Sequence, residues 1–269
     1  MQPARPDLAI TSWPGRLGNN IIQVSNCLHV ALATGANVRL PGHICFNKTY
    51  ISVNGRPKSR RRISDLFLYP GRTAEHAVPI SDDHRLHVRK IIRNLLYVNP
   101  REATMSDDKT LVIHIRSGDI FAYHESKRLH QDYIMPPLSF YVRVIEELGT
   151  RIDKIHLVAE DTLNPCVELL LRKYSNAVFK KSSLAEDIRL IMGARKIVYG
   201  MGTFAPQLLE FFNDSLMEVY RPSNADKVSL LGRSYKDNVI DIGDYIDKMG
   251  GWKNTPEQHA LMCSYEFAE

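Results

Sequence analysis

The sequence lacks paired cysteines, long apolar runs and several common catalytic motifs. Its four cysteines are widely scattered and include no C-x-x-C pair, which argues against a disulfide framework or a cysteine-ligated zinc site and favours free thiols. No stretch approaches the roughly 18 apolar residues of a membrane-spanning helix, so we expect no transmembrane segment. The patterns of a P-loop, a hydrolase nucleophile elbow and an H-E-x-x-H zinc site are also absent, and none of these chemistries is indicated.

Charge of one sign is only slightly in excess, at +5 for 269 residues. This surplus suits a small anionic ligand and is too small to indicate nucleic acid, which we do not expect as a partner. The 44% hydrophobic and 24% charged residues are ordinary for a globular chain. We expect a soluble protein, cytoplasmic as the sequence stands or trimmed from a longer anchored protein.

Apolar segments alternate with helical patterns along most of the chain. In the second half we expect strands at residues 110–115, 154–159, 177–179, 196–199 and 216–220, and helices at 138–148, 165–174, 183–194 and 206–212. The first half repeats the pattern more loosely, with strands at 8–13 and 37–40 and helices at 20–34 and 83–96. Such alternation is typical of parallel, doubly wound sheets. We predict an α/β fold with two Rossmann-type lobes, residues 1–105 and 106–222, whose parallel sheets face a cleft. Residues 223–269 form a tail that packs back across the lobes.

The strongest candidate site is residues 114–119, His-Ile-Arg-Ser-Gly-Asp, directly after an apolar strand. In a parallel sheet this cluster lies at the carboxyl end of the strand, where ligands bind. Arg116 offers a charged fork of donors suited to a diphosphate, and Gly118 permits a tight turn. The structural alternative is an Arg116–Asp119 ion pair with His114 as a core residue.

Two glycine-bearing turns precede predicted helices. Residues 14–20, Pro-Gly-Arg-Leu-Gly-Asn-Asn, contain Asn19 and Asn20 as possible caps. Residues 200–207, Gly-Met-Gly-Thr-Phe-Ala-Pro-Gln, contain Thr203 as a possible cap whose hydroxyl could also reach a phosphate. The free N–H groups at the start of a helix bind anions. A tight turn with a cap explains the first of these segments equally well.

Acidic residues near two other strands are weaker candidates. Asp187 precedes the second glycine turn, and its alternative is a place on a solvated helix face. Glu160 and Asp161 leave the strand that ends near residue 159, where a carboxylate often contacts a ribose or a base. A helix-capping role for Asp161 or Asn164 is equally compatible with the sequence.

In combination these segments resemble the α-1,2/α-1,6 and protein-O-fucosyltransferase superfamily. Its members carry an early G-R-x-G-N loop, an H-x-R-R-G-D-like strand end, and a late acid followed by a TFSSQ-like element. Residues 15–19, residues 114–119, and Asp187 with residues 202–207 appear here in the same order. The resemblance extends over roughly residues 10 to 215.

The resemblance implies a GT-B-like fold and metal-independent, inverting transfer of a sugar, with GDP-fucose the favoured donor, onto a glycan hydroxyl. The N-terminal lobe would take the acceptor side and the C-terminal lobe the nucleotide sugar. The donor-binding residues that it implies are Arg16, Gly18, Asn19, His114, Arg116, Asp187, Thr203, Phe204 and Gln207. Among them, Arg116 would contact the β-phosphate and Asp187 would contact the nucleoside.

The sequence departs from the family pattern at three positions. Ser117 replaces the second arginine, and Ala205 and Pro206 replace serines of the late element. These changes leave the donor open, with UDP-xylose or a nucleotide-linked rhamnose as alternatives. A non-catalytic protein that binds sugar nucleotides or glycans, and a nucleotide enzyme of another class, are the competing functions.

A D-x-D sequence, the usual divalent-metal anchor of another large class of nucleotide-sugar enzymes, is absent. We therefore expect no metal and no cofactor beyond the nucleotide sugar as co-substrate. The leaving diphosphate would be stabilised by Arg116 and the turn at Thr203. The acceptor hydroxyl needs a general base, and Asp119 and Glu125 are the candidates that follow Arg116 closely.

Overall fold

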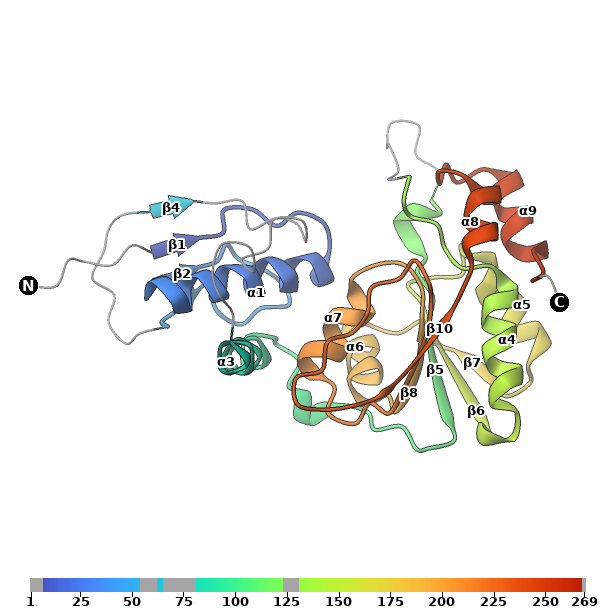
Figure 1. The fold of residues 1–269 in the computed structure, drawn as a ribbon, viewed down its shortest axis with the longest axis horizontal. Coiled ribbons are helices and arrows are strands. Elements are labelled where there is room, and N and C mark those ends of the chain that lie inside the picture. The colour runs from blue at the N-terminus through green and yellow to red at the C-terminus, as the bar shows by residue number, and fades with distance from the viewer. Residues whose placement is uncertain (1–6, 54–61, 65–80, 123–130, 268–269) are drawn as a thin grey trace, which may run out of the picture. The chain divides into compact units, whose positions relative to one another are not determined.

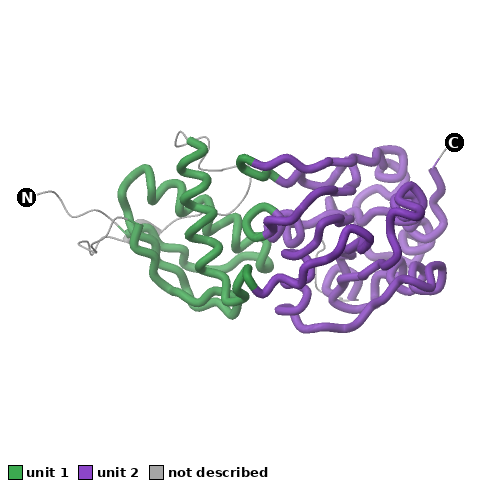
Figure 2. Tube along the Cα trace, turned by 90° about the horizontal axis from the view of Figure 1, so that it is seen from below, with its two compact units in different colours: residues 1–101, 210–212, 229–232 green, residues 102–209, 213–228, 233–269 purple. Residues whose placement is uncertain are grey.

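A computed structural model describes residues 7–53, 62–64, 81–122 and 131–267 (Figure 1). The chain divides into two compact units (Figure 2). Unit 1 contains residues 1–101, 210–212 and 229–232, and unit 2 contains residues 102–209, 213–228 and 233–269. The lobe boundary predicted at residues 105 and 106 lies close to this division.

Unit 1 contains a four-stranded sheet in the order β3-β2-β1-β4. Its strands are β1 (Asp7–Ala9), β2 (Asn37–Arg39), β3 (Tyr50–Ile51) and β4 (Arg62–Ser64). β1 pairs in parallel with β2 and β4, whereas β3 runs antiparallel to β2. The parallel arrangement predicted for this lobe therefore holds for three strands, and the short β3 is the exception.

Two long helices belong to unit 1. α1 (Leu17–Thr34) ends at Gly35, whose φ of 70° is the left-handed conformation that glycine adopts easily. α3 (Asp82–Arg93) begins after Ser81, whose side chain accepts a hydrogen bond from the His84 N–H. The C-terminal end of α1 and the N-terminal end of α3 are therefore both determined by residues adjacent in the sequence.

Unit 2 contains a six-stranded sheet in the order β10-β9-β8-β5-β6-β7. All of its neighbouring strands pair in parallel. The strands are β5 (Thr110–His114), β6 (Lys154–Val158), β7 (Ala177–Phe179), β8 (Lys196–Tyr199), β9 (Glu218–Pro222) and β10 (Lys236–Ile240). If β5 is counted as the first strand, the order from the β7 edge is 3-2-1-4-5-6, the order of the Rossmann fold. The predicted α/β class with a parallel sheet is confirmed.

Helices cover both faces of this sheet (Figure 1). α4 (Leu138–Leu148) and α5 (Pro165–Lys173) lie on one face, and α6 (Leu184–Gly193) and α7 (Phe204–Phe212) lie on the other. α8 (Gly243–Met249) and α9 (Pro256–Ser264) follow β10, and α9 packs against α4 and α5. The short 3-10 turns are η2 (Pro100–Glu102), η3 (Gly118–Ile120) and η4 (Gly149–Arg151). The tail predicted to cross the lobes thus adds a strand and two helices to unit 2.

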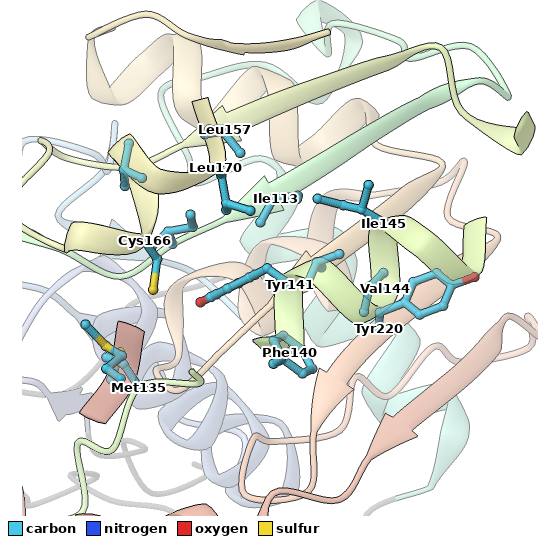
Figure 3. Packing of buried hydrophobic residues seen from close by; sticks show 14 of the residues in the cluster. Ile113, Met135, Phe140, Tyr141, Val144, Ile145, Leu157, Cys166, Leu170 and Tyr220 are labelled. Atoms are coloured by element: carbon cyan, nitrogen blue, oxygen red, sulfur yellow. The ribbon is translucent and has the colours of Figure 1, made fainter. Parts of the chain in front are cut away.

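A large apolar core lies between the sheet of unit 2 and the α4–α5 layer (Figure 3). Leu111 and Ile113 of β5 belong to it, because alternate residues of a strand point to the same face. Labelled neighbours in the figure include Phe140, Tyr141, Val144 and Ile145 of α4, and Cys166 and Leu170 of α5. Burying each large side chain contributes about 1.5–3 kcal/mol, so this core fixes where the end of β5 points.

Two further expectations concern thiols and membrane spans. All four cysteines are free, as predicted. Burial raises the pKa of the Cys27 thiol to about 12, which keeps it protonated.

Within the described ranges, no helix combines the length and the apolar character that a membrane span requires.

Candidate functional site

The candidate site lies at the carboxyl ends of β5 and β8. β5 pairs with β6 on one side and with β8 on the other, and His114 is in register with Tyr199. The direction in which strands are added therefore reverses between β5 and β8. Ligands of open α/β sheets bind at such a switch point, outside the carboxyl ends of the strands. Residues 115–119 and 200–204 both leave the sheet at this edge.

Arg116 follows the last residue of β5, His114, by two positions. Its Nη2 lies 2.5 Å from Oδ1 of Asp119, and the two side chains are 19% and 31% exposed. The ion pair considered in the structural alternative therefore exists. It also keeps the guanidinium in one place at the sheet edge, so the pair is compatible with both a structural and a ligand-binding role.

A hydrogen-bonded network below Arg116 joins the ends of β5 and β6. The amide of Asn164 donates from Nδ2 to the Arg116 carbonyl at 3.0 Å, and the Asn164 N–H donates to Ser117 Oγ at 3.0 Å. Ser117 Oγ in turn donates to the carboxylate of Asp161, which also accepts the Gly118 N–H at 3.2 Å. Asn164 and Ser117 are almost fully buried, so the loop that follows Arg116 rests on satisfied polar groups in the interior.

Asp161 is thereby a structural residue of the site. Burial works to raise its pKa, but hydrogen bonds from Ser117, Leu163 and Gly118 outweigh it and lower the pKa below the ordinary value. Asn164 is the N-cap of α5, as one sequence alternative proposed, because its side chain accepts the Cys166 N–H at 3.0 Å. The serine in place of a second arginine is thus part of the network.

Gly118 and Glu160 lie against each other. Gly118 has φ of +70°, and a Cβ at this position would overlap the Glu160 carboxylate. Glycine is therefore favoured by the backbone conformation, whereas the flexible Glu160 side chain could move away from a Cβ. An exposed carboxylate is placed beside the turn that carries Asp119.

His114 and Phe204 bring the β5 end to the start of α7. Their ring centroids are 5.5 Å apart. Burial and the positive charge of Arg116 lower the pKa of His114 to about 3, so the imidazole is neutral at physiological pH. His114 is 9% exposed and packs as a core residue under the site, which matches its structural alternative.

The N-terminus of α7 follows β8 at the same edge. Thr203 is at the N-cap position, as predicted, but its side chain makes no capping hydrogen bond, so the predicted cap is wrong in that respect. The first turn carries no acidic residue. The first helical bond runs from the Gln207 N–H to the Thr203 carbonyl at 3.1 Å. Before Gln207, Phe204 and Ala205 carry N–H groups without an intrahelical acceptor, whereas Pro206 has no N–H. Such N–H groups at a helix start are suited to an anion.

Asp187 lies in the first turn of α6, which follows β7 at the carboxyl edge. Its side chain accepts a hydrogen bond from Ser182 Oγ. Burial raises the pKa of Asp187 above its ordinary value; the Ser182 hydrogen bond opposes this rise, and Glu186 adds to it. A half-buried carboxylate with a raised pKa differs from a residue on a solvated helix face.

Arg16, Gly18 and Asn19 belong to unit 1, at the start of α1. α1 begins at Leu17 with the exposed Arg16 as N-cap, so Asn19 lies inside the first turn and the predicted asparagine cap is wrong. The amide of Asn20 instead donates to the Pro14 carbonyl at 3.0 Å. Because no side chain caps this helix, its first N–H groups point out of the turn.

One predicted residue and one predicted absence remain untested. Glu125 lies outside the described residues. In the described ranges, no cluster of three His, Cys, Asp or Glu side chains could hold a metal ion. The support of Arg116 by Ser117 and Asn164 was not predicted. The sequence indicated Asn164 only as a possible helix cap, a role that fits its place before Pro165.

In comparisons with known proteins, the structure is similar to solved structures of fucosyltransferases. No protein-family model and no curated protein matches the sequence. The structure is similar to that of NodZ α-1,6-fucosyltransferase co-crystallised with GDP, at 11% identity and a TM-score of 0.48, with 84% of this chain and 98% of that chain covered. It is similar to POFUT1 in complex with GDP, at 11% identity and a TM-score of 0.45, over 82% and 98% of the two chains. It is also similar to Arabidopsis thaliana FUT1 in complex with GDP, at 13% identity and a TM-score of 0.47, over 83% and 72%.

Proposed function

We propose that this protein is a nucleotide-sugar glycosyltransferase, with GDP-fucose as the favoured donor and a glycan hydroxyl as acceptor. The observation that carries the proposal is the position of Arg116 at the switch point of a 3-2-1-4-5-6 sheet. There it lies next to His114, which contacts Phe204 at the start of α7. The guanidinium of Arg116 and the N-terminus of α7, whose first turn has no acidic residue, lie at the same sheet edge. Together they form a site for a diphosphate.

In the proposed reaction, the bond between the anomeric carbon and the β-phosphate oxygen breaks, and its electron pair stays on the leaving diphosphate. The guanidinium of Arg116 and the N–H groups near Thr203 stabilise the charge that develops there. The acceptor oxygen forms its new bond on the opposite face of the sugar, so the configuration inverts. Asp119 or Glu125 takes the proton of the acceptor hydroxyl.

The remaining roles follow the motif resemblance. Asp187 hydrogen-bonds the nucleoside, because its half-buried carboxylate can accept a hydrogen bond from a ligand N–H in addition to the one from Ser182. Gln207 contributes to the diphosphate site from α7. In unit 1, Arg16, Gly18 and Asn19 are the residues that the resemblance assigns to donor binding. Metal independence and inversion are parts of this proposal.

A thermal-shift screen with GDP, UDP and dTDP tests the donor class. A ligand at 100 times its Kd adds about 2.7 kcal/mol of stability, which for a chain of this size corresponds to a rise of several degrees in Tm. We expect GDP to raise Tm and the other two nucleotides to do so less. A larger shift with UDP or dTDP would point to a different donor, and no shift with any of them would contradict the nucleotide site.

Donor hydrolysis separates an enzyme from a binding protein. A glycosyltransferase should release GDP slowly from GDP-fucose in the absence of acceptor, because water can replace the acceptor hydroxyl. GDP-fucose binding without any release of GDP, with or without a panel of glycan acceptors, would instead favour the non-catalytic alternative.

A further inference from the structure

Residues 250–259, near the C-terminus, contact the turn that follows Arg116. This turn, η3, contains Asp119, the ion-pair partner of Arg116. Residues 250–259 lie more than a hundred positions later in the chain. Trp252 contacts Ile120 of η3, and Asn254 and His259 contact Phe121, the residue that follows η3. Two of these contacts are hydrogen bonds to main-chain carbonyls, which depend on the position of the turn itself.

Trp252 supplies the buried part of the contact. Its Nε1 donates to the Ile120 carbonyl at 3.1 Å, and its ring packs edge-on against Phe121 with centroids 5.2 Å apart. Its own N–H donates to the Gln131 carbonyl at 2.9 Å. With 1% of its surface exposed, Trp252 is a core residue whose loss would disturb folding as well as η3.

Asn254 supplies the second carbonyl contact. Its Nδ2 donates to the Phe121 carbonyl at 3.1 Å. Its φ of 59° is the left-handed conformation, and it is the one positive-φ residue other than glycine among the described residues. Asparagine tolerates this conformation better than most residues. Backbone strain of this kind persists where the surrounding structure holds it and is often found at functional sites.

His259 orients the Asn254 amide. Its Nε2 lies 2.8 Å from Oδ1 of Asn254, and because that oxygen only accepts, Nε2 carries the proton. The imidazole stacks on Trp252 at 5.8 Å with an interplanar angle of 14°, and it contacts Phe121 at 5.5 Å. With its oxygen engaged by His259, the amide of Asn254 presents its NH₂ to the Phe121 carbonyl.

We propose that Asn254 and His259 are positioning residues that hold Asp119 and Arg116 in the geometry needed for transfer. The inference rests on the proposed function for its catalytic consequence. Asn254 acts through the carbonyl of Phe121 at the end of η3, and His259 acts through Asn254. A displacement of about 1 Å at a reacting group can cost on the order of 100-fold in rate, so a loosened turn lowers kcat.

Three variants separate this role from general stabilisation. Asn254→Gly keeps the left-handed backbone without strain and removes only the amide. His259→Gln places a new NH₂ where Nε2 lies and should rescue function relative to His259→Ala. The matched control is Asn238→Ala in β10, which removes an equivalent half-buried bond from Nδ2 to the Val219 carbonyl at 3.0 Å, at the far edge of the sheet.

The experiment measures kcat and KM for GDP-fucose, together with hydrogen–deuterium exchange of the peptide that contains residues 118–122. For Asn254→Gly and His259→Ala we expect kcat to fall roughly 10- to 100-fold, KM to change less than about 3-fold, and exchange at 118–122 to become faster. His259→Gln should recover most of both effects. Asn238→Ala should match wild type in kcat and in exchange at 118–122.

Unchanged exchange at residues 118–122 in Asn254→Gly and His259→Ala would overturn the positioning role, whatever the activity. Faster exchange with unchanged kcat would overturn its catalytic consequence. A wild-type protein that neither binds GDP nor turns over GDP-fucose would instead contradict the proposed function, and the exchange data alone would then decide whether this region holds the turn.

Discussion

At the scale of single residues, Arg116 forms an ion pair in the structure and would bind a diphosphate in the proposed reaction. In the described structure it pairs with Asp119, and in the proposed reaction it also meets a diphosphate whose charge grows in the transition state. A fixed guanidinium binds that state more tightly than the ground state. The existing ion pair orients the group before the donor arrives.

Arg116→Ala should therefore lower kcat by about 10²–10³, or roughly 3–4 kcal/mol of transition-state stabilisation. Arg116→Lys keeps the charge without the planar fork and should recover only part of this loss. The measurement is kcat together with Tm. The control is Arg143→Ala, which removes an exposed pair with Glu147 and should leave kcat unchanged. A folded Arg116→Ala protein with near-wild-type turnover would mean that the ion pair is only structural.

Asp187 leads to a prediction about both binding and pH. Its folded-state pKa is raised above the ordinary 3.8, so the folded state binds this proton more tightly than the unfolded chain. The resulting stabilisation is complete below about pH 3.8 and is lost as pH rises through the folded value. At pH 7 the Asp187→Asn protein should be at least as stable as wild type.

The same variant should bind the donor less well. Loss of a charged hydrogen bond costs about 1.5–3 kcal/mol, so KM for GDP-fucose should rise roughly 10- to 100-fold, with a smaller effect on kcat. Urea unfolding at pH 7 and steady-state kinetics check both parts. An unchanged KM, or a variant that is clearly less stable at pH 7, would contradict the assignment.

At the scale of elements, Asn164 links the segments that follow β5 and β6. Its side chain caps α5 and also bonds the Arg116 carbonyl. Asn164→Ala should cost about 2–4 kcal/mol, because it removes a helix cap and leaves buried polar groups unpaired. It should also lower kcat, since the segment beneath Arg116 loses its support.

The matched control for this variant is Ser183→Ala. Ser183 caps α6 through a reciprocal capping box with Glu186, and its loss should cost only about 1 kcal/mol. Denaturant unfolding gives the stability difference and single-turnover kinetics give the effect on transfer. Equal stability losses in the two variants would show that the bond to the Arg116 carbonyl contributes nothing measurable.

At the scale of the whole molecule, the proposed mechanism stabilises a leaving diphosphate with the charges of the protein alone. The sequence has no D-x-D anchor, and the described residues hold no cluster suited to a metal ion. We therefore expect transfer to continue unchanged in EDTA and to gain little from added manganese or magnesium. A strict requirement for either ion would contradict the proposed mechanism.

Strands and helices could be predicted from the sequence where neighbouring residues alone determine them. The buried strand at 110–115 and the helices at 138–148 and 183–194 depend on neighbouring residues, and the structure contains each of them with small shifts of the ends. The cap of α1 was misplaced because both asparagines lie inside the first turn, after an exposed arginine. The polar segment 236–240 gives little strand signal, yet it pairs along the whole edge of β9.

Residue patterns along the chain predict that a strand ends in His-Ile-Arg-Ser-Gly-Asp and that a glycine turn precedes a helix near Thr203, because apolar periodicity and turn residues act over a few positions. Long-range packing, in contrast, places β5 beside β8, supports Arg116 with Ser117 and Asn164, and fixes the following turn with Trp252 and Asn254. These contacts join residues some 40 to 130 positions apart. Such pairings are selected by the burial of whole faces and by the satisfaction of interior polar groups, which no short window of sequence reports.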